Sequence, residues 1–285
     1  MAKKLIDTYA VWVPAILVII FSYGARNYQV DDALIYLRYV RNFYDGYGLV
    51  YNPGDRFNGL TSPLFTYVIL IVSWAIRDYQ ASLIACSALF MSIASIYSGM
   101  LFSKTKLEQL FTSLTVGSLG YFYLTFGMET PLFLMLIVLS LYLHKLESDF
   151  FVICITLLTI TRSEGVFLAA PMLISFLLIH RRLPKTRYLV VAALIFLTPL
   201  LVNHFYYGRF LPETGGAKLL QGKSGYWSDM LHPDWNFFFL GGKPLSPWYL
   251  MLPAYGMFIL ARNVEAILGL VFLSFLAFFY GYFSI

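Results

Sequence analysis

The sequence predicts an all-α protein, a polytopic transmembrane helical bundle, and three observations carry that prediction. Of its 285 residues, 59% are hydrophobic and only 12% are charged. The mean hydropathy of +0.71 is too high for a soluble domain with a solvated surface. Apolar runs long enough for membrane helices recur along the whole chain, about nine or ten of them.

The first apolar run, from about residue 9 to 23, follows the basic pair Lys3-Lys4. No small-residue cleavage signal follows it, so we expect it to stay in the membrane as an anchor. The remaining candidate spans lie near residues 63–76, 81–102, 110–126, 131–143, 150–161, 166–179, 188–205, 248–260 and 266–283.

The basic residues concentrate in short loops between these runs, at Lys3-Lys4, Lys104, Lys106, Lys145 and residues 180–187. Such loops face the cytoplasm under the positive-inside rule, so the net charge of +5 does not require nucleic acid as a partner. Because Lys104 and Lys106 favour an inside loop, we expect residues 63–102 to cross only once, with 63–76 re-entrant or interfacial.

We expect one transmembrane domain over residues 1–285, with a cytoplasmic N-terminus and two large extracytoplasmic loops, 24–62 and 207–247. A soluble C-terminal domain is expected to be absent. Alternation of the spans then puts four polar clusters on the outer face. Cys86 and Cys154 lie inside apolar runs without ligand spacing, which indicates packing or lipid contact rather than a metal site.

The first polar cluster begins with Asp31 and Asp32, just past the first apolar run. Carboxylates lose hydration at a membrane boundary, so they persist there where they do chemistry, bind a cation or pair with a fixed charge. The residues that follow predict an amphipathic helix along the membrane surface. An interfacial anchor helix capped by Asp31 is the alternative. The expected apolar face holds Ala33, Leu37, Val40 and Tyr44, and the opposite face holds Arg38, Arg41 and Asp45.

The second and third clusters each interrupt apolar sequence. Glu129, in 127–131, falls at an expected helix start, where a capping role would be ordinary. Residues 161–165 divide the apolar stretch 150–179, so two short helices are expected to meet there. Arg162 and Glu164 would then line an aqueous cavity, where they pair with each other or meet a ligand. A purely structural ion pair is the alternative.

The fourth cluster is the long polar loop after residues 202–209. Lys218, Lys223 and Lys243 offer point charges for a phosphate, and Tyr226, Trp227 and Trp235 offer rings for a sugar or the headgroup region. His204 and His232 have no ligand partners at usable spacing, so no metal site is predicted.

Several of these segments together resemble the signature motifs of GT-C superfamily glycosyltransferases. Within that superfamily, the resemblance is to the group with terminal arabinofuranosyltransferases and lipopolysaccharide or O-antigen sugar transferases. The motifs are Asp31-Asp32-Ala33 with Tyr36-Leu37-Arg38-Tyr39 and Arg41-Asn42, Gly46-Tyr47-Gly48-Leu49-Val50-Tyr51-Asn52-Pro53-Gly54, Gly59-Leu60-Thr61-Ser62-Pro63-Leu64, Gly127-Met128-Glu129-Thr130-Pro131-Leu132, Thr161-Arg162-Ser163-Glu164-Gly165, and Tyr206-Tyr207-Gly208 through Lys218.

The resemblance implies an inverting transfer of a sugar from a polyprenyl-phosphate donor to a cell-surface glycan, lipopolysaccharide or similar acceptor, outside a bacterial plasma membrane. One carboxylate of the acidic pair would be the general base, with Asp31 favoured and Asp32 second. No cofactor is certain, although the acidic pair also allows a divalent cation. Residues expected at the donor phosphate and sugar are Arg38, Arg41, Glu129, Arg162, Glu164 and Lys218. Of these, Glu129 and Glu164 would orient sugar hydroxyls or hold the arginines.

The chain departs from the family pattern at two positions. It has Arg162-Ser163-Glu164-Gly165 where relatives commonly read Arg-Pro-Glu-Gly, and Pro212-Glu213-Thr214 where they read Pro-Asn-Thr. It also ends directly after an apolar run, so we expect either a compact member or a truncated product. Two rival functions are a transporter or flippase of a lipid-linked sugar, marked by midplane charges, and a non-catalytic protein with this fold.

Overall fold

The computed structural model describes residues 2–28, 30–163 and 165–213. Every regular element in these ranges is helical, which confirms the predicted all-α class. The chain divides into two compact units, Met1–Ser163 with Pro184–Pro212, and Glu164–Leu183 with Glu213–Ile285. Each unit is described by itself. In the second unit, the described element is α9 (Gly165–His180).

The first unit contains the candidate site. Its elements in chain order are α1 (Ala2–Gly24), η1 (Ala25–Asn27), α2 (Asp31–Tyr44), α3 (Pro63–Ile76), α4 (Tyr79–Phe102), α5 (Lys106–Gly117), α6 (Gly120–Leu124), α7 (Thr130–Lys145), α8 (Phe151–Thr161), α10 (Thr186–Val202) and the π-helical turn η2 (Asn203–Tyr207).

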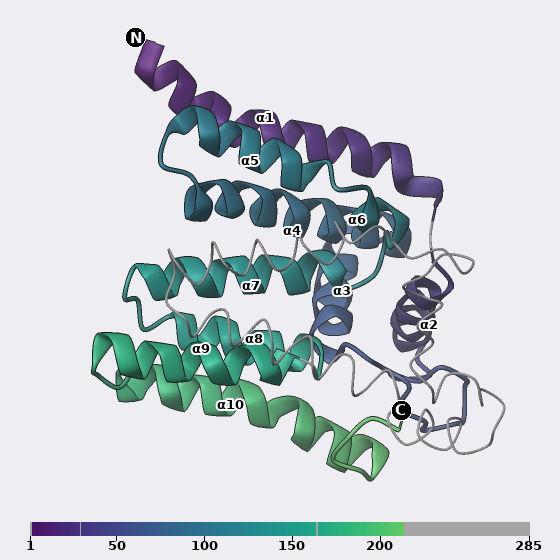
Figure 1. Ribbon diagram of the computed structural model, residues 1–285. Helices are drawn as coiled ribbons and strands as arrows, with labels where there is room; N and C mark the ends of the chain where they lie inside the picture. The colour runs from purple at the N-terminus through teal and green to yellow at the C-terminus, as the bar shows by residue number, and fades with distance from the viewer. Residues whose placement is uncertain (1, 29, 164, 214–285) are drawn as a thin grey trace, which may run out of the picture. The chain divides into compact units, whose positions relative to one another are not determined.

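Helix α4 is the centre of the first unit, since it packs against α1, α3, α5 and α7. Helix α8 then packs between α7 and α10. In Figure 1, α1, α4, α5, α7, α8 and α10 run roughly side by side, while α2 crosses one end of them. We call the end that carries α2 the site end, and the opposite end the basic end.

The basic end collects the turn between α4 and α5, the turn between α7 and α8, and the start of α10 (Figure 1). These segments carry Lys104, Lys106, Lys145 and Lys185. The lysine-bearing turns of the first unit therefore lie together at one end, as the positive-inside pattern predicts for the short basic loops. Arginines are not confined to that end, since Arg38 and Arg41 on α2 lie at the site end.

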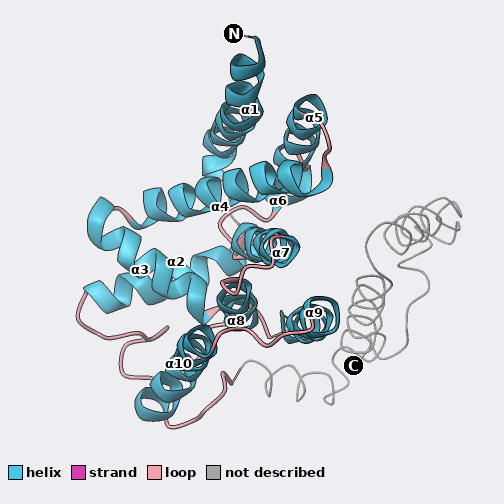
Figure 2. Ribbon diagram, turned by 90° about the vertical axis from the view of Figure 1, so that its left-hand side faces the viewer, coloured by secondary structure: helices cyan, strands magenta, loops and turns pink. Residues whose placement is uncertain are grey.

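Three helical segments of the described chain are long and apolar enough to cross a membrane, Tyr9–Asn27, Tyr79–Phe102 and Thr186–Tyr207. Four further apolar helices are shorter, among them α3 with 14 residues. Figure 2 shows α3 lying beside α2 rather than along the helices of the bundle. This placement is compatible with one crossing over residues 63–102. The expected spans at 248–260 and 266–283 lie outside the described residues.

The expected single run 110–126 is wrong, because the structure divides it. Helix α5 ends at Gly117, and the short helix α6 begins only at Gly120. The start of α5 is fixed by a capping box, in which the Thr105 hydroxyl accepts from the Glu108 N–H and the Glu108 carboxylate accepts from the Thr105 N–H. The carboxylate also accepts from the Lys104 N–H, and the bonds from the backbone N–H groups of Lys104 and Thr105 lower the pKa of Glu108.

Close packing of α4 on α5 depends on Gly99. A Cβ atom at this position would lie 2.6 Å from the backbone carbonyl oxygen of Gln109 and would collide with the Ser113 hydroxyl. The carbonyl belongs to the α5 backbone and cannot turn aside. Gly120, in contrast, has no atom within 4 Å of the position that a Cβ would take.

We predict that Gly99→Ala destabilises the protein by about 1–3 kcal/mol, because the added methyl overpacks the α4–α5 contact. Thermal denaturation in detergent measures the effect. Gly120→Ala is the matched control and should leave the melting temperature unchanged or raise it slightly, since alanine favours a helix over glycine. Equal melting temperatures for the two variants would contradict the close approach at Gly99.

Candidate active site

The site end is built around the buried face of α2. Tyr36, Tyr39 and Asn42 are at most 3% exposed, and they lie beside Ala33 and Val40 on the side of α2 that packs inward. The apolar face expected from sequence is therefore wrong in part. Tyr44 is 37% exposed, and two tyrosines and an asparagine occupy the interior face.

A buried carboxylate lies where α2, α7 and α8 meet. The side chain of Glu129 is 1% exposed. Its Oε1 accepts from the Arg162 guanidinium at 2.7 Å, and its Oε2 accepts from the Tyr36 hydroxyl at 2.8 Å. The Tyr36 hydroxyl also lies 2.9 Å from the Thr61 hydroxyl. We call these four residues the Glu129 network.

The helix termini explain why these side chains meet. Glu129 is the N-cap residue of α7, but its side chain makes no capping bond. The expected capping role is therefore wrong, since the carboxylate turns to α2 and α8 instead. Arg162 directly follows α8 with an extended backbone, φ −147°, which confirms that the apolar stretch 150–179 is divided there.

The Glu129 network holds the carboxylate of its charge pair away from water. Burial, followed by the negative charge of Glu129, raises the pKa of Tyr36 well above its ordinary value. Tyr36 therefore stays protonated and donates to the carboxylate. Arg162 is 32% exposed against 1% for Glu129, so the guanidinium reaches from the buried carboxylate toward solvent. A cation held in this way can meet an anionic ligand.

Side chains of α2 also fix the loop that follows it. The Tyr39 hydroxyl accepts from the Gly59 N–H at 2.8 Å and donates to the Phe57 carbonyl at 2.9 Å. The Asn42 amide donates to the carbonyls of Val50 and Tyr51, both at 2.8 Å. These bonds pair backbone groups of the loop, which have no partner in a helix or strand.

The end of α10 fixes the same loop from the other side. The Tyr206 hydroxyl accepts from the Leu49 N–H at 3.1 Å, and the Tyr207 hydroxyl donates to the Leu49 carbonyl. Gly48 has φ +85°, and a Cβ there would collide with the Tyr206 hydroxyl. Only glycine suits this position, for both its backbone and its space.

A third bond joins these regions, from the side-chain amide of Asn58 to the side-chain Oδ1 of Asn203 at 2.9 Å. Asn203 begins the π-helical turn η2, which re-aims the last turn of the α10 segment toward the loop. The motifs in residues 46–64 and 206–208 are far apart in sequence, but they contact each other in the structure.

The structure places Asp31 and Asp32 in the first turn of α2, both exposed. The N-cap residue is Val30, so the alternative in which Asp31 caps α2 is wrong. Within the described ranges, neither carboxylate has a hydrogen bond or ion pair. Asp32 precedes Tyr36 by four residues and shares its side of the helix, while Asp31 lies about 100° further round.

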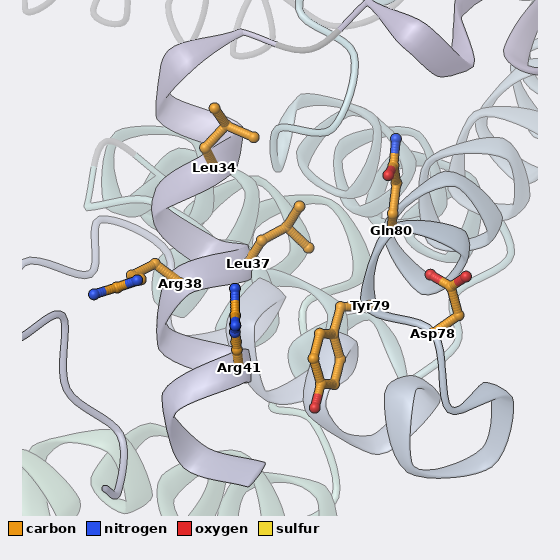
Figure 3. Close-up of a pocket in the computed structure, with 7 residues that line it drawn as sticks. All are labelled: Leu34, Leu37, Arg38, Arg41, Asp78, Tyr79 and Gln80. Carbon is orange, nitrogen blue, oxygen red and sulfur yellow. The ribbon is translucent and has the colours of Figure 1, made fainter. Parts of the chain in front are cut away.

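The structure separates the cations that the sequence grouped together. Arg38 and Arg41 project from the exposed side of α2 and line a pocket of about 350 Å³ with the start of α4 (Figure 3). Arg162 joins the Glu129 network on the inner side. Glu164 and Lys218 lie outside the described residues. Sequence reasoning missed Tyr36 and Thr61, although both stand inside motifs that it recognised.

Curated relatives agree with the motif resemblance. The chain is 36% identical over 128 residues to a terminal β-(1→2)-arabinofuranosyltransferase of Corynebacterium glutamicum, covering 41% of this chain and 18% of that relative. It is 29% identical over 261 residues to the protein of the same name from Mycobacterium tuberculosis, covering 81% of this chain and 40% of that relative.

The chain therefore spans less than half the length of either relative that it matches. No family model matches the chain, and no solved structure gives a significant match. The helical architecture and the two relatives agree with each other. They confirm the resemblance of this membrane protein to the terminal arabinofuranosyltransferase group of glycosyltransferases.

Proposed function

We propose that this protein is a membrane glycosyltransferase that moves a sugar from a polyprenyl-phosphate donor to a cell-surface glycan or lipopolysaccharide-type acceptor. The site end would face the outside of a bacterial plasma membrane, and the basic end the cytoplasm. Arabinofuranose is the sugar to try first, because both curated relatives are named for its transfer.

One observation carries this proposal: an exposed acidic pair and a half-exposed arginine occur at the same end of the bundle, joined through one helix. Asp32 lies one helical turn from Tyr36 on α2, and Tyr36 and Arg162 share the two oxygens of Glu129. A base and a cation near each other are what inverting transfer from a lipid phosphate requires.

The reaction assigns a task to each group. The acceptor hydroxyl oxygen forms a bond to the anomeric carbon as its proton passes to an aspartate carboxylate. The bond from that carbon to the phosphate oxygen breaks, and the polyprenyl phosphate leaves with the electron pair. Arg162 stabilises the charge that develops on the phosphate. The register of α2 supports Asp32 as the base over Asp31, the reverse of the order that the resemblance implies.

The two rival functions make different demands. A transporter or flippase of a lipid-linked sugar needs polar groups near the membrane midplane. Among the described residues of the first unit, the Glu129 network and the acidic pair lie instead at the site end. A non-catalytic protein with this fold would carry the same architecture without turnover, so a transfer assay separates it from an enzyme.

We predict that Asp32→Asn lowers sugar transfer by about 100- to 10,000-fold, the contribution of a positioned general base. The full chain is reconstituted in lipid with polyprenyl-phosphate arabinofuranose and a glycan acceptor, and transfer is compared with that of Asp31→Asn. Parallel runs with a chelator and with added Mg²⁺ test whether transfer needs the divalent cation that the acidic pair allows.

Asp55→Asn is the matched control for the acidic pair, because Asp55 is an exposed aspartate in the loop after α2. It should retain full transfer. Unaltered transfer in both Asp31→Asn and Asp32→Asn would refute the carboxylate mechanism. Wild-type inactivity with every donor tried would refute the proposed function for this chain.

We predict that Glu129→Gln lowers kcat/KM for the donor about tenfold or more, because the amide leaves Arg162 without its counter-charge and misplaces it. Glu108→Gln, at the basic end, is the matched control and should leave kcat/KM unaltered. An unaltered kcat/KM in Glu129→Gln would contradict this positioning role.

A further inference from the structure

The pocket between α2 and the start of α4 is not used by the proposed reaction. Its wall on α2 is formed by Leu34, Leu37, Arg38 and Arg41. Its other wall is formed by Asp78, Tyr79 and Gln80, which lie across from them in Figure 3. The pocket thus combines two arginines with two leucines and an aromatic ring, which is the composition of an amphiphile site. In Figure 3, Arg41 lies on the Tyr79 side of α2, and the Arg38 guanidinium lies at the other edge of the helix.

The charges in the pocket favour an anion. The Nε of Arg38 donates to the Tyr51 carbonyl at 3.2 Å, and its terminal nitrogens make no hydrogen bond to any residue that the structure describes. Arg41 has one exposed ion-pair contact, 3.5 Å to Asp45, which contributes little in water. The acid that lines the pocket, Asp78, accepts from the Ala81 N–H and caps α4.

The position of the pocket favours a lipid. Tyr79 lines it and is also the first residue of α4, a helix long and apolar enough to span the membrane. The ring of Tyr79 stacks on that of Tyr44, with centroids 5.7 Å apart. Aromatic side chains at the ends of spans sit at the headgroup level. On the neighbouring α3, Ile71 and Trp74 are 70% and 75% exposed, as lipid-facing residues are.

We propose that this pocket binds an anionic phospholipid, with the phosphate between Arg38 and Arg41 and the first part of an acyl chain along Leu34 and Leu37. The exposed half of Leu34, at 49%, would then be covered by hydrocarbon rather than water. This site would be separate from the Glu129 network, since the two lie on different sides of α2. The proposal goes beyond sugar transfer and does not depend on it.

Lipid binding to the purified full chain tests the proposal. The protein is held in mild detergent with equal amounts of phosphatidylglycerol and phosphatidylcholine, and bound lipids are counted by native mass spectrometry. Wild type should prefer phosphatidylglycerol. The double variant Arg38→Gln/Arg41→Gln should lose that preference by about tenfold, the effect of a lost charge-assisted hydrogen bond.

The double variant Arg26→Gln/Arg56→Gln is the matched control, because it removes one partly exposed and one exposed arginine, neither of which lines the pocket. It should bind lipid as wild type does. If the pocket variant fails to fold, Leu34→Asn replaces it, and weaker retention of phosphatidylglycerol is again expected.

Three outcomes would overturn the proposal. The pocket variants retain the wild-type preference, or the control variant loses as much as they do. Alternatively, polyprenyl phosphate or millimolar inorganic phosphate displaces phosphatidylglycerol from the wild type, which would assign the pocket to the donor or to free phosphate. None of these experiments measures sugar transfer. The lipid-binding proposal can therefore fail while the proposed function holds, and the reverse.

Discussion

The carboxylate of Glu129 is buried, so its hydrogen bonds and its counter-charge must come from the protein rather than from water. Breaking a buried charge pair by removing one partner costs about 3–5 kcal/mol, which exceeds what most single contacts contribute. The Arg162 guanidinium and the Tyr36 hydroxyl meet this demand from two other helices. The relative positions of α2, α7 and α8 at the site end are consequently tied to one side chain.

The same constraint explains why the buried face of α2 carries polar side chains. This face carries hydroxyl and amide groups, because these groups bind a carboxylate and a stretch of unpaired loop backbone. Tyr39 and Asn42 satisfy the loop from one side, and Asn203 and Tyr206 satisfy it from the other. These bonds therefore fix the loop between α2 and α3 beside the site, although the loop has no regular secondary structure of its own.

Sequence reasoning predicted the helical class, the amphipathic helix and the break after Thr161, because hydrophobic periodicity and chain polarity report these features directly. From spacing alone, it paired Arg162 with Glu164, and only the family resemblance offered Glu129 as a residue that could hold an arginine. Glu164 is two residues away in sequence, whereas Glu129 is 33 residues away and becomes a neighbour only through packing. The inner face of α2 was misread for a related reason, since a tyrosine pattern does not show whether its hydroxyls meet water or protein.

The contact between Leu49 and Tyr206 spans 157 positions of the chain. A ribosome that has made the acidic pair, α2 and the loop must still make eight further helices of the described chain, α3 to α10, before that tyrosine exists. During synthesis the loop can thus form its bonds to Tyr39 and Asn42 early, whereas Leu49 acquires its bonds to Tyr206 and Tyr207 only after α10 has been made. A chain stopped before α10 would contain every acidic residue of the candidate site and still lack the geometry that orders it.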